Sequence, residues 1–209
     1  AHLRDFDDAV ATVLLGRVRK NRRTNDDDIV TAWHEAAHAC AGLVLADAGD
    51  PVYITIKARA QSGGTTWKSE ADTKYPTRAN AWAQLVVYMA GRAGEETLLD
   101  GEYTSGPVGD LAGATELAWN MIMRYGMTDM GLASSGLAME TAFGLDPSLR
   151  ANVNDLLEKA LNQARDICTE HHGLLQTLAE ELLAKQTLGV DDITEIWNTY
   201  NTTQLQPSS

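Results

Sequence analysis

Apolar residues recur every three to four positions along most of this chain, which is the spacing of helices that bury one face. The spacing predicts a short helix over residues 5–16 and longer helices over 26–49, 76–99, 110–126, 147–171, 174–186 and 191–199. Residues typical of helix ends support these limits, with Asp146-Pro147 at the start of one helix and Gly126 at the end of another. The chain is therefore expected to be mainly helical.

Two short segments depart from the helical spacing. Residues 52–58 and 64–68 are rich in β-branched and aromatic types, and Gly63-Gly64 supplies a turn between them. This pattern predicts two strands of a small sheet. Residues 126–146 show no clear period and are expected to form a loop. The predicted fold class is mainly α (α+β), a helical bundle-like domain with a small β-sheet next to the helix at 26–49.

Composition narrows the classes of function. The 209 residues are 44% hydrophobic, which is enough for one sizeable core, and their net charge is −12. This acidic balance lacks the basic footprint of a nucleic-acid binder. No run of about 18 apolar residues occurs, so no membrane segment is expected in this chain. Cys40 and Cys168 lie in apolar helical patterns and are expected to be buried free thiols, which favours the cytoplasm or another reducing compartment.

The residues with the clearest chemistry are His34-Glu35-Ala36-Ala37-His38. In a helix, His34 and His38 lie one turn apart on the same face, so both imidazoles can reach one zinc ion (Zn²⁺). Glu35 is then placed to take a proton from a water on the metal. Unpaired histidines would be costly in so apolar a helix. The pattern therefore predicts a catalytic zinc site.

A catalytic zinc needs a third protein ligand, and spacing along the chain does not identify it. Asp110 follows a glycine-rich loop and opens a helix, where a helix cap is the plainer interpretation. Glu95 and Glu96 lie near a helix end, where a solvated face is the plainer interpretation. The other candidates are Glu116, His2, His171 and His172.

The chain resembles the FtsH family of AAA+ ATP-dependent zinc metalloproteases over nearly its whole length. Residues 34–38 follow Thr31-Ala32-Trp33 and match that family's HEAGH motif. Residues 89–96 resemble its MxGRxAEE segment, and residues 104–115 resemble its TxGAxNDxxxAT segment. Residues 117–127 continue the likeness. Ala37 stands where the family's motif has Gly, and Gly109 stands where it has Asn.

The resemblance implies a site. It makes Asp110 the third zinc ligand beside His34 and His38, with Glu35 as the general base. The family's edge strand falls at residues 64–67, so the expected substrate-binding residues are Gly64, Thr65, Thr66 and Trp67. A strand edge can hold an extended peptide by main-chain hydrogen bonds, although an ordinary sheet strand explains the same residues equally well.

The resemblance also implies a domain order and partners. Residues 5–16 resemble the segment that closes the AAA+ lid, and no Walker A motif is present. We expect the end of the lid and a linker at 1–25, the zinc peptidase domain at 26–203 and a flexible tail at 204–209. The implied substrates are unfolded polypeptides, and the implied partner is an AAA+ ATPase domain in the same, often membrane-anchored, parent protein. The implied assembly is a homo-oligomer, a hexamer.

A structural role is the alternative. The helix at 147–171 carries an apolar stripe that can serve either the core of one chain or contacts between chains. Its members are Leu156, Leu157, Ala160, Leu161 and Ala164. In the second case the chain would be an oligomerisation module of an AAA+ protease with little activity of its own.

Overall fold

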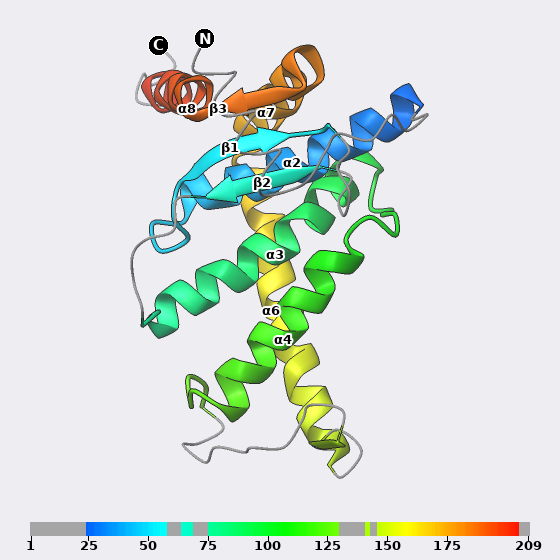
Figure 1. The fold of residues 1–209 in the computed structure, drawn as a ribbon, viewed down its shortest axis with the longest axis vertical. Coiled ribbons are helices and arrows are strands. Elements are labelled where there is room, and N and C mark those ends of the chain that lie inside the picture. The colour runs from blue at the N-terminus through cyan, green and yellow to red at the C-terminus, as the bar shows by residue number, and fades with distance from the viewer. Residues whose placement is uncertain (1–23, 58–63, 69–74, 130–140, 143–145, 205–209) are drawn as a thin grey trace.

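A computed structural model describes residues 24–57, 64–68, 75–129, 141–142 and 146–204. The predicted helix at 5–16 and residues 205–209 of the predicted tail lie outside this part of the chain. In chain order the described elements are α2 Asn25–Val44, β1 Pro51–Thr55, β2 Thr65–Lys68, α3 Arg78–Leu98, α4 Val108–Met123, α6 Pro147–Glu170, α7 His172–Lys185, β3 Thr187–Gly189 and α8 Val190–Gln204 (Figure 1). The predicted fold class, mainly helical with a small sheet, is confirmed.

Side-chain caps fix where the long helices begin. The Thr24 hydroxyl accepts a hydrogen bond from the Asp27 N–H, and the Asp27 carboxylate accepts one from the Thr24 N–H, so α2 opens with a capping box. Thr77 and Asn80 make the same reciprocal pair at α3, which therefore begins after Thr77 and not at residue 76 as predicted. Asp146 caps α6 at the predicted residue.

The sheet is antiparallel with the strand order β2-β1-β3 (Figure 1). Ile54 of β1 pairs with Thr66 on one side and Leu188 on the other. The two predicted strands are confirmed, whereas β3 was not predicted. β2 lies at the edge of the sheet and contacts α2, which brings an edge strand next to the helix that carries the histidines.

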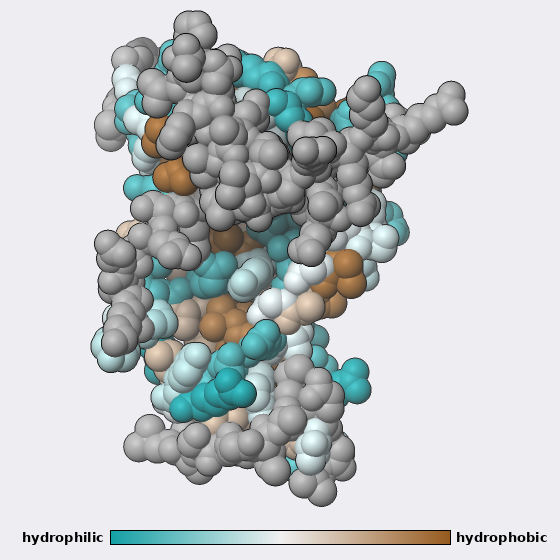
Figure 2. Space-filling model, in the orientation of Figure 1, coloured by the Kyte–Doolittle hydropathy of each residue, from teal (hydrophilic) through white to brown (hydrophobic). Residues whose placement is uncertain are grey.

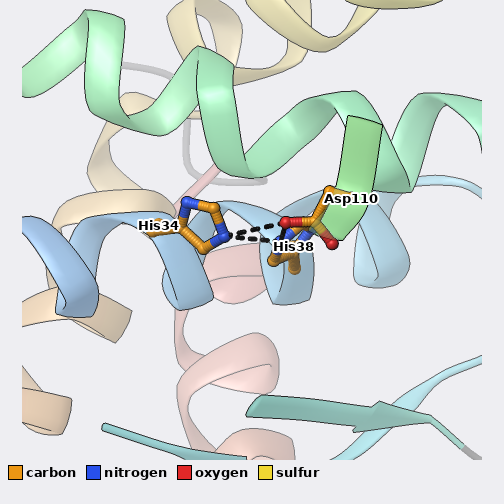
Figure 3. A group of neighbouring side chains, drawn as sticks. All are labelled: His34, His38 and Asp110. Atoms are coloured by element: carbon orange, nitrogen blue, oxygen red, sulfur yellow. Dashed lines mark hydrogen bonds and ion pairs between the residues drawn. The ribbon is translucent and has the colours of Figure 1, made fainter. Parts of the chain in front are cut away.

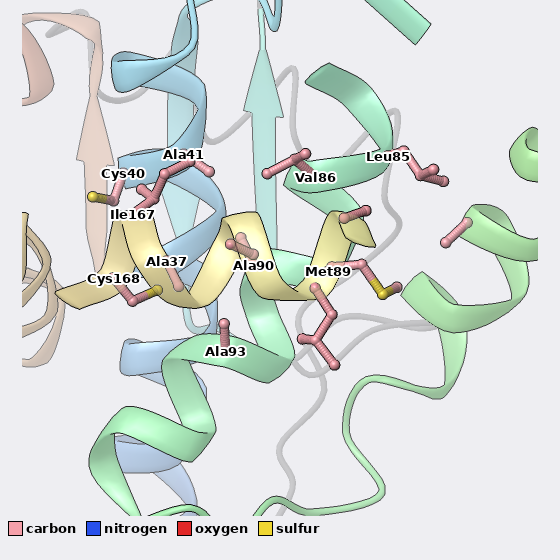
Figure 4. Close-up of a cluster of buried hydrophobic side chains, with 14 of the residues drawn as sticks. Ala37, Cys40, Ala41, Leu85, Val86, Met89, Ala90, Ala93, Ile167 and Cys168 are labelled. Carbon is pink, nitrogen blue, oxygen red and sulfur yellow. The ribbon is translucent and has the colours of Figure 1, made fainter. Parts of the chain in front are cut away.

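The centre of the molecule is the contact of α2 with α3 and of α3 with α6 (Figure 4). Small side chains allow α2 and α3 to approach closely. A Cβ added to Gly94 of α3 would lie 2.5 Å from the Ala37 Cβ and 2.7 Å from the Trp33 carbonyl oxygen. The glycine at 94 therefore accommodates the alanine at 37. Cys40 and Cys168 lie in this core as buried free thiols, as predicted.

The apolar stripe of α6 faces the interior of its own chain. Leu157, Ala160, Leu161 and Ala164 are buried, and Leu156 is partly buried against the same core. The stripe is thus accounted for by packing within one molecule. Among the helices that the structure describes, none combines the length and the apolar character needed to cross a bilayer.

Candidate metal centre

Helix α2 brings its two histidines to one point, because four residues make about one helical turn. The Nε2 atoms of His34 and His38 lie 3.1 Å apart, and the two rings meet edge to face with centroids 4.7 Å apart. Both side chains are buried. The predicted geometry of this pair is therefore present in the folded chain.

Asp110 joins the pair from the first turn of α4. Its Oδ2 lies 3.1 Å from His34 Nε2 and 3.4 Å from His38 Nε2, and the three side chains point toward one another (Figure 3). One ligand atom from each residue falls within 4.8 Å of the others, a group that can hold a metal ion. Of the carboxylates that spacing left open, Asp110 is the one that the folded chain brings to both histidines.

The outer nitrogen of each imidazole is already engaged. His38 Nδ1 donates to the Val87 carbonyl oxygen at 2.7 Å, and His34 Nδ1 lies 2.9 Å from Glu95 Oε1. A carbonyl and a carboxylate can only accept, so each ring carries a hydrogen on Nδ1 and directs its Nε2 atom to the shared point. This is the arrangement of metal-binding histidines whose outer nitrogen is fixed by an acceptor.

Glu95 is a residue that the sequence interpretation placed wrongly. It is only 1% exposed, and its Oε2 accepts hydrogen bonds from the Thr104 N–H at 2.7 Å and the Thr104 hydroxyl at 2.9 Å. Burial alone would raise the pKa of Glu95, but the hydrogen bonds from His34 and Thr104 outweigh burial and lower it. Glu95 therefore stays ionised and orients His34. The sequence signal for Glu95 was its place in residues 89–96, the segment that resembles MxGRxAEE.

The remaining candidates for the third ligand lie elsewhere. Glu96 is bridged by Arg92 at 2.8 Å and by Arg165 at 2.7 Å. Glu116 is exposed on α4. His171 contacts the Tyr200 hydroxyl at 3.0 Å, and His172 packs its ring against Trp33. His2 lies outside the described residues.

Glu35 lies beside the histidines and against the edge strand. The Thr66 hydroxyl of β2 donates to Glu35 Oε2 at 2.8 Å, and a Cβ added to Gly64 would lie 2.6 Å from Glu35 Oε1. Burial raises the pKa of Glu35, and the nearby His34 and His38 only partly offset this effect. A carboxylate of raised basicity is better suited to accept a proton near neutral pH.

A cavity of about 850 Å³ runs along α2 and contains the whole group. Its walls come from α2, from the edge strand, from α3 and from the start of α4. Its lining includes Gly64, Thr65, Thr66, Val87, Tyr88, Val108 and Gly109. Trp67 belongs to the same strand, but its side chain lies outside what the structure describes. Apolar side chains gather at the surface where α4 begins, with Val108 and Leu111 exposed there (Figure 2).

The residues fit a zinc ion. A Cβ added to Gly91 would lie 2.6 Å from His38 Nε2 and 2.7 Å from His34 Nε2, so the glycine keeps a space free between the two nitrogens. Two imidazole nitrogens and one carboxylate oxygen form a typical donor set of catalytic zinc, which keeps a fourth position open. No fourth protein ligand belongs to the group among the residues that the structure describes.

The carboxylates of Asp110 and Glu95 favour a positive charge next to the imidazole nitrogens. Burial alone would lower the pKa of His34, but hydrogen bonds with Asp110 and Glu95 raise it to about 10. Burial would raise the pKa of Asp110, but its hydrogen bonds with the two histidines hold it below its usual range. The carboxylates thus draw one positive charge to the imidazoles, and either a proton or a metal ion can supply it.

Comparison with known proteins gives one consistent family. The model of peptidase family M41 matches residues 22–196. The ATP-dependent zinc metalloprotease FtsH of Mycobacterium tuberculosis is 35% identical over 209 residues, covering 92% of this chain and 27% of the relative. The protein of that name from Rubrobacter xylanophilus is 31% identical over 217 residues, covering 94% and 32%. That from an aster yellows witches'-broom phytoplasma is 31% identical, covering 92% and 29%. The chain therefore spans about a third or less of the length of these relatives.

Proposed function

Because this chain belongs to peptidase family M41, we propose that it is a zinc metalloendopeptidase domain that hydrolyses peptide bonds of unfolded polypeptides. We assign zinc to His34, His38 and Asp110, and the role of general base to Glu35. One observation carries the proposal: two imidazole nitrogens and a carboxylate oxygen converge within 3.4 Å, beside a buried glutamate, in a cavity bordered by an edge strand.

The edge strand is the element best placed to hold the substrate. β2 is an edge strand of the described sheet, and an extended peptide can pair with such a strand by main-chain hydrogen bonds, which do not depend on the substrate's side chains. Gly64, Thr65 and Thr66 line the cavity at this edge. We propose that they, with Trp67, align the peptide so that one carbonyl lies over the histidines. A folded substrate has no such free segment and should resist cleavage.

The chain's own residues then move the proton. When bound, zinc polarises the scissile carbonyl and lowers the pKa of a bound water to roughly 7. Glu35 takes a proton from the attacking water at a carboxylate oxygen and delivers it to the leaving amide nitrogen as the C–N bond breaks. Thr66 holds the other oxygen of that carboxylate. Val87 and Glu95 keep the imidazole rings from rotating during these steps.

The partners of the domain are also proposed. The relatives' names describe ATP-dependent proteases, and those proteins are more than three times as long as this chain. We infer that the parent protein carries an AAA+ ATPase domain in the same polypeptide, which delivers unfolded chains, and that it works as a hexamer. We keep residues 1–25 as the end of the ATPase lid with its linker and residues 26–203 as the peptidase domain.

The decisive experiment is casein hydrolysis by the zinc-loaded protein, followed with and without a chelator, beside the variant Glu35→Gln. The wild type should cleave casein and should lose activity when zinc is removed. Glu35→Gln should bind zinc as the wild type does and cleave at a rate reduced at least about 100-fold, because general-base catalysis supplies that much. Full activity of Glu35→Gln would remove Glu35 from the mechanism. An inactive wild type with bound zinc would favour the structural module instead.

A further inference from the structure

Tyr88 is a polar residue of the cavity that the mechanism above leaves unused. It lies on α3 next to Val87, whose carbonyl oxygen fixes His38. Its half-buried side chain lines the cavity that contains the histidines, Glu35 and Asp110. Within the described part of the chain, its hydroxyl has no hydrogen-bond partner. A phenol held in a catalytic cavity without a partner is available to a ligand.

The ring of Tyr88 packs against α4 at Gly113. A Cβ added to Gly113 would lie 3.0 Å from the ring atoms Cε1 and Cζ and 3.2 Å from the hydroxyl oxygen. Any larger residue at 113 would push the ring away. Gly113 follows Asp110 by three residues and lies on the same side of the helix. The phenol therefore packs against α4 at a position one helical turn after Asp110, the residue that we assign to zinc.

The hydroxyl keeps its proton in this setting. Burial raises the pKa of Tyr88, and the charges of Asp110 and Glu116 raise it further. The group is thus a hydrogen-bond donor at neutral pH. A donor of this kind is most useful where negative charge develops during the reaction.

We propose that the Tyr88 hydroxyl donates a hydrogen bond to the oxyanion that forms on the scissile carbonyl when water adds to it. The inference rests on the proposed peptidase function and adds a catalytic residue to it. The carbonyl oxygen gains its negative charge as the new C–O bond forms, and the hydrogen bond strengthens at that moment. Tyr88 therefore lowers the barrier without tightening substrate binding.

The test is Tyr88→Phe, which keeps the ring on Gly113 and removes only the hydroxyl. With casein as the substrate we expect kcat to fall about 100-fold, as when one donor to an oxyanion is removed, with little change in KM. Zinc content and the unfolding transition should stay as in the wild type. The matched control is Tyr125→Phe, at an exposed tyrosine that does not line the cavity, and its kcat should not change.

A second measurement does not need turnover. Calorimetry on the zinc-loaded protein compares a phosphinic analogue of an acetylated Phe-Leu peptide, which mimics the tetrahedral anion, with the corresponding amide. Tyr88→Phe should weaken binding of the phosphinic analogue at least about 10-fold and leave binding of the amide unchanged. This result would support the role of Tyr88 even if casein cleavage, and with it the proposed function, failed.

Several outcomes would overturn the inference. An unchanged kcat in Tyr88→Phe together with unchanged binding of the phosphinic analogue would show that the hydroxyl does not act on the oxyanion. Absence of measurable binding of this analogue to the wild type would do the same. Loss of zinc from Tyr88→Phe, with a normal rate once zinc is saturating, would show that the phenol acts on Asp110 alone.

Discussion

The substitution Gly91→Ala places a single methyl group beside the Nε2 atoms of His34 and His38, where we assign the metal. The new Cβ would lie 2.5 Å from His34 Cε1 and 2.6 Å from His38 Nε2, whereas carbon atoms in contact normally stay about 3.5–4.0 Å apart. Either the two imidazole rings or the backbone of α3 must therefore move by about 1 Å. The rings cannot simply rotate, because Glu95 and Val87 hold their Nδ1 atoms.

We expect Gly91→Ala to change the free energy of unfolding only slightly but to weaken zinc binding strongly. Overpacking costs about 1–3 kcal/mol, while alanine in place of glycine in a helix gains about 1 kcal/mol. The free energy of unfolding of the metal-free protein should thus fall by no more than about 2 kcal/mol. Loss of ligand orientation alone weakens metal binding 10- to 100-fold, so we expect Gly91→Ala to lose about 100-fold or more in zinc affinity.

The assay is a zinc titration in competition with a chromophoric chelator, together with urea unfolding of the metal-free protein. The matched control is Gly173→Ala in α7, where the new methyl group would meet its nearest neighbour, a ring carbon of Tyr200, at an ordinary 3.9 Å. This control should bind zinc as the wild type does and be up to about 1 kcal/mol more stable. Wild-type zinc affinity in Gly91→Ala would refute the assignment of the metal to the space between the imidazoles.

Three further predictions concern Glu95, His34 and Glu96. Glu95→Gln should reduce zinc affinity about 10- to 100-fold in the same titration, because a neutral amide orients His34 less firmly; an affinity equal to that of the wild type would contradict this role. Zinc binding at pH 7 should release protons, since the pKa of His34 is raised to about 10 without metal, and affinity should fall as the pH falls; calorimetry in buffers of different ionisation enthalpy measures the release. Glu96→Gln should destabilise the fold by about 1–2 kcal/mol, since Arg165 loses a charged partner. Burial would raise the pKa of Glu96, but its arginine partners lower it below 4.5, so this stabilisation is present above pH 4.5 and disappears as the pH falls through the folded-state pKa; a difference in urea midpoint independent of pH would contradict the prediction.

The sequence was sufficient for features that depend on local spacing. The pair His34 and His38 is fixed by the helical repeat, and the cap at Asp146 lies at the residue that was predicted. The cap of α2 at Thr24 was not predicted, since that helix was expected to begin at residue 26. Asp110 is different, because spacing alone left several carboxylates open. Only the resemblance to a family singled it out before the fold brought α4 to α2.

The features that escaped prediction depend on contacts between distant segments. Glu95 lies next to a charged neighbour in the sequence, and only the packing of α3 on α2 decides that one glutamate is buried and the other bridges arginines. β3 has three residues, Thr187–Gly189, too few to show an alternating pattern, and it is a strand because it pairs with β1. Helix α2 ends at Val44, before the predicted turn, where Leu45 takes up an extended conformation.

The contact of Thr66 with Glu35 joins the strand that we propose binds the substrate to the residue that we propose as general base. The threonine hydroxyl lies 2.8 Å from the glutamate carboxylate and 3.1 Å from its backbone carbonyl, so any displacement of the strand is felt directly at the base. Under the proposed function, a polypeptide that pairs poorly with the strand would therefore also displace the carboxylate of Glu35. Such coupling would make the base respond to the backbone conformation of the bound peptide and not to its side chains, and it would restrict which residues can replace Thr66 without loss of activity.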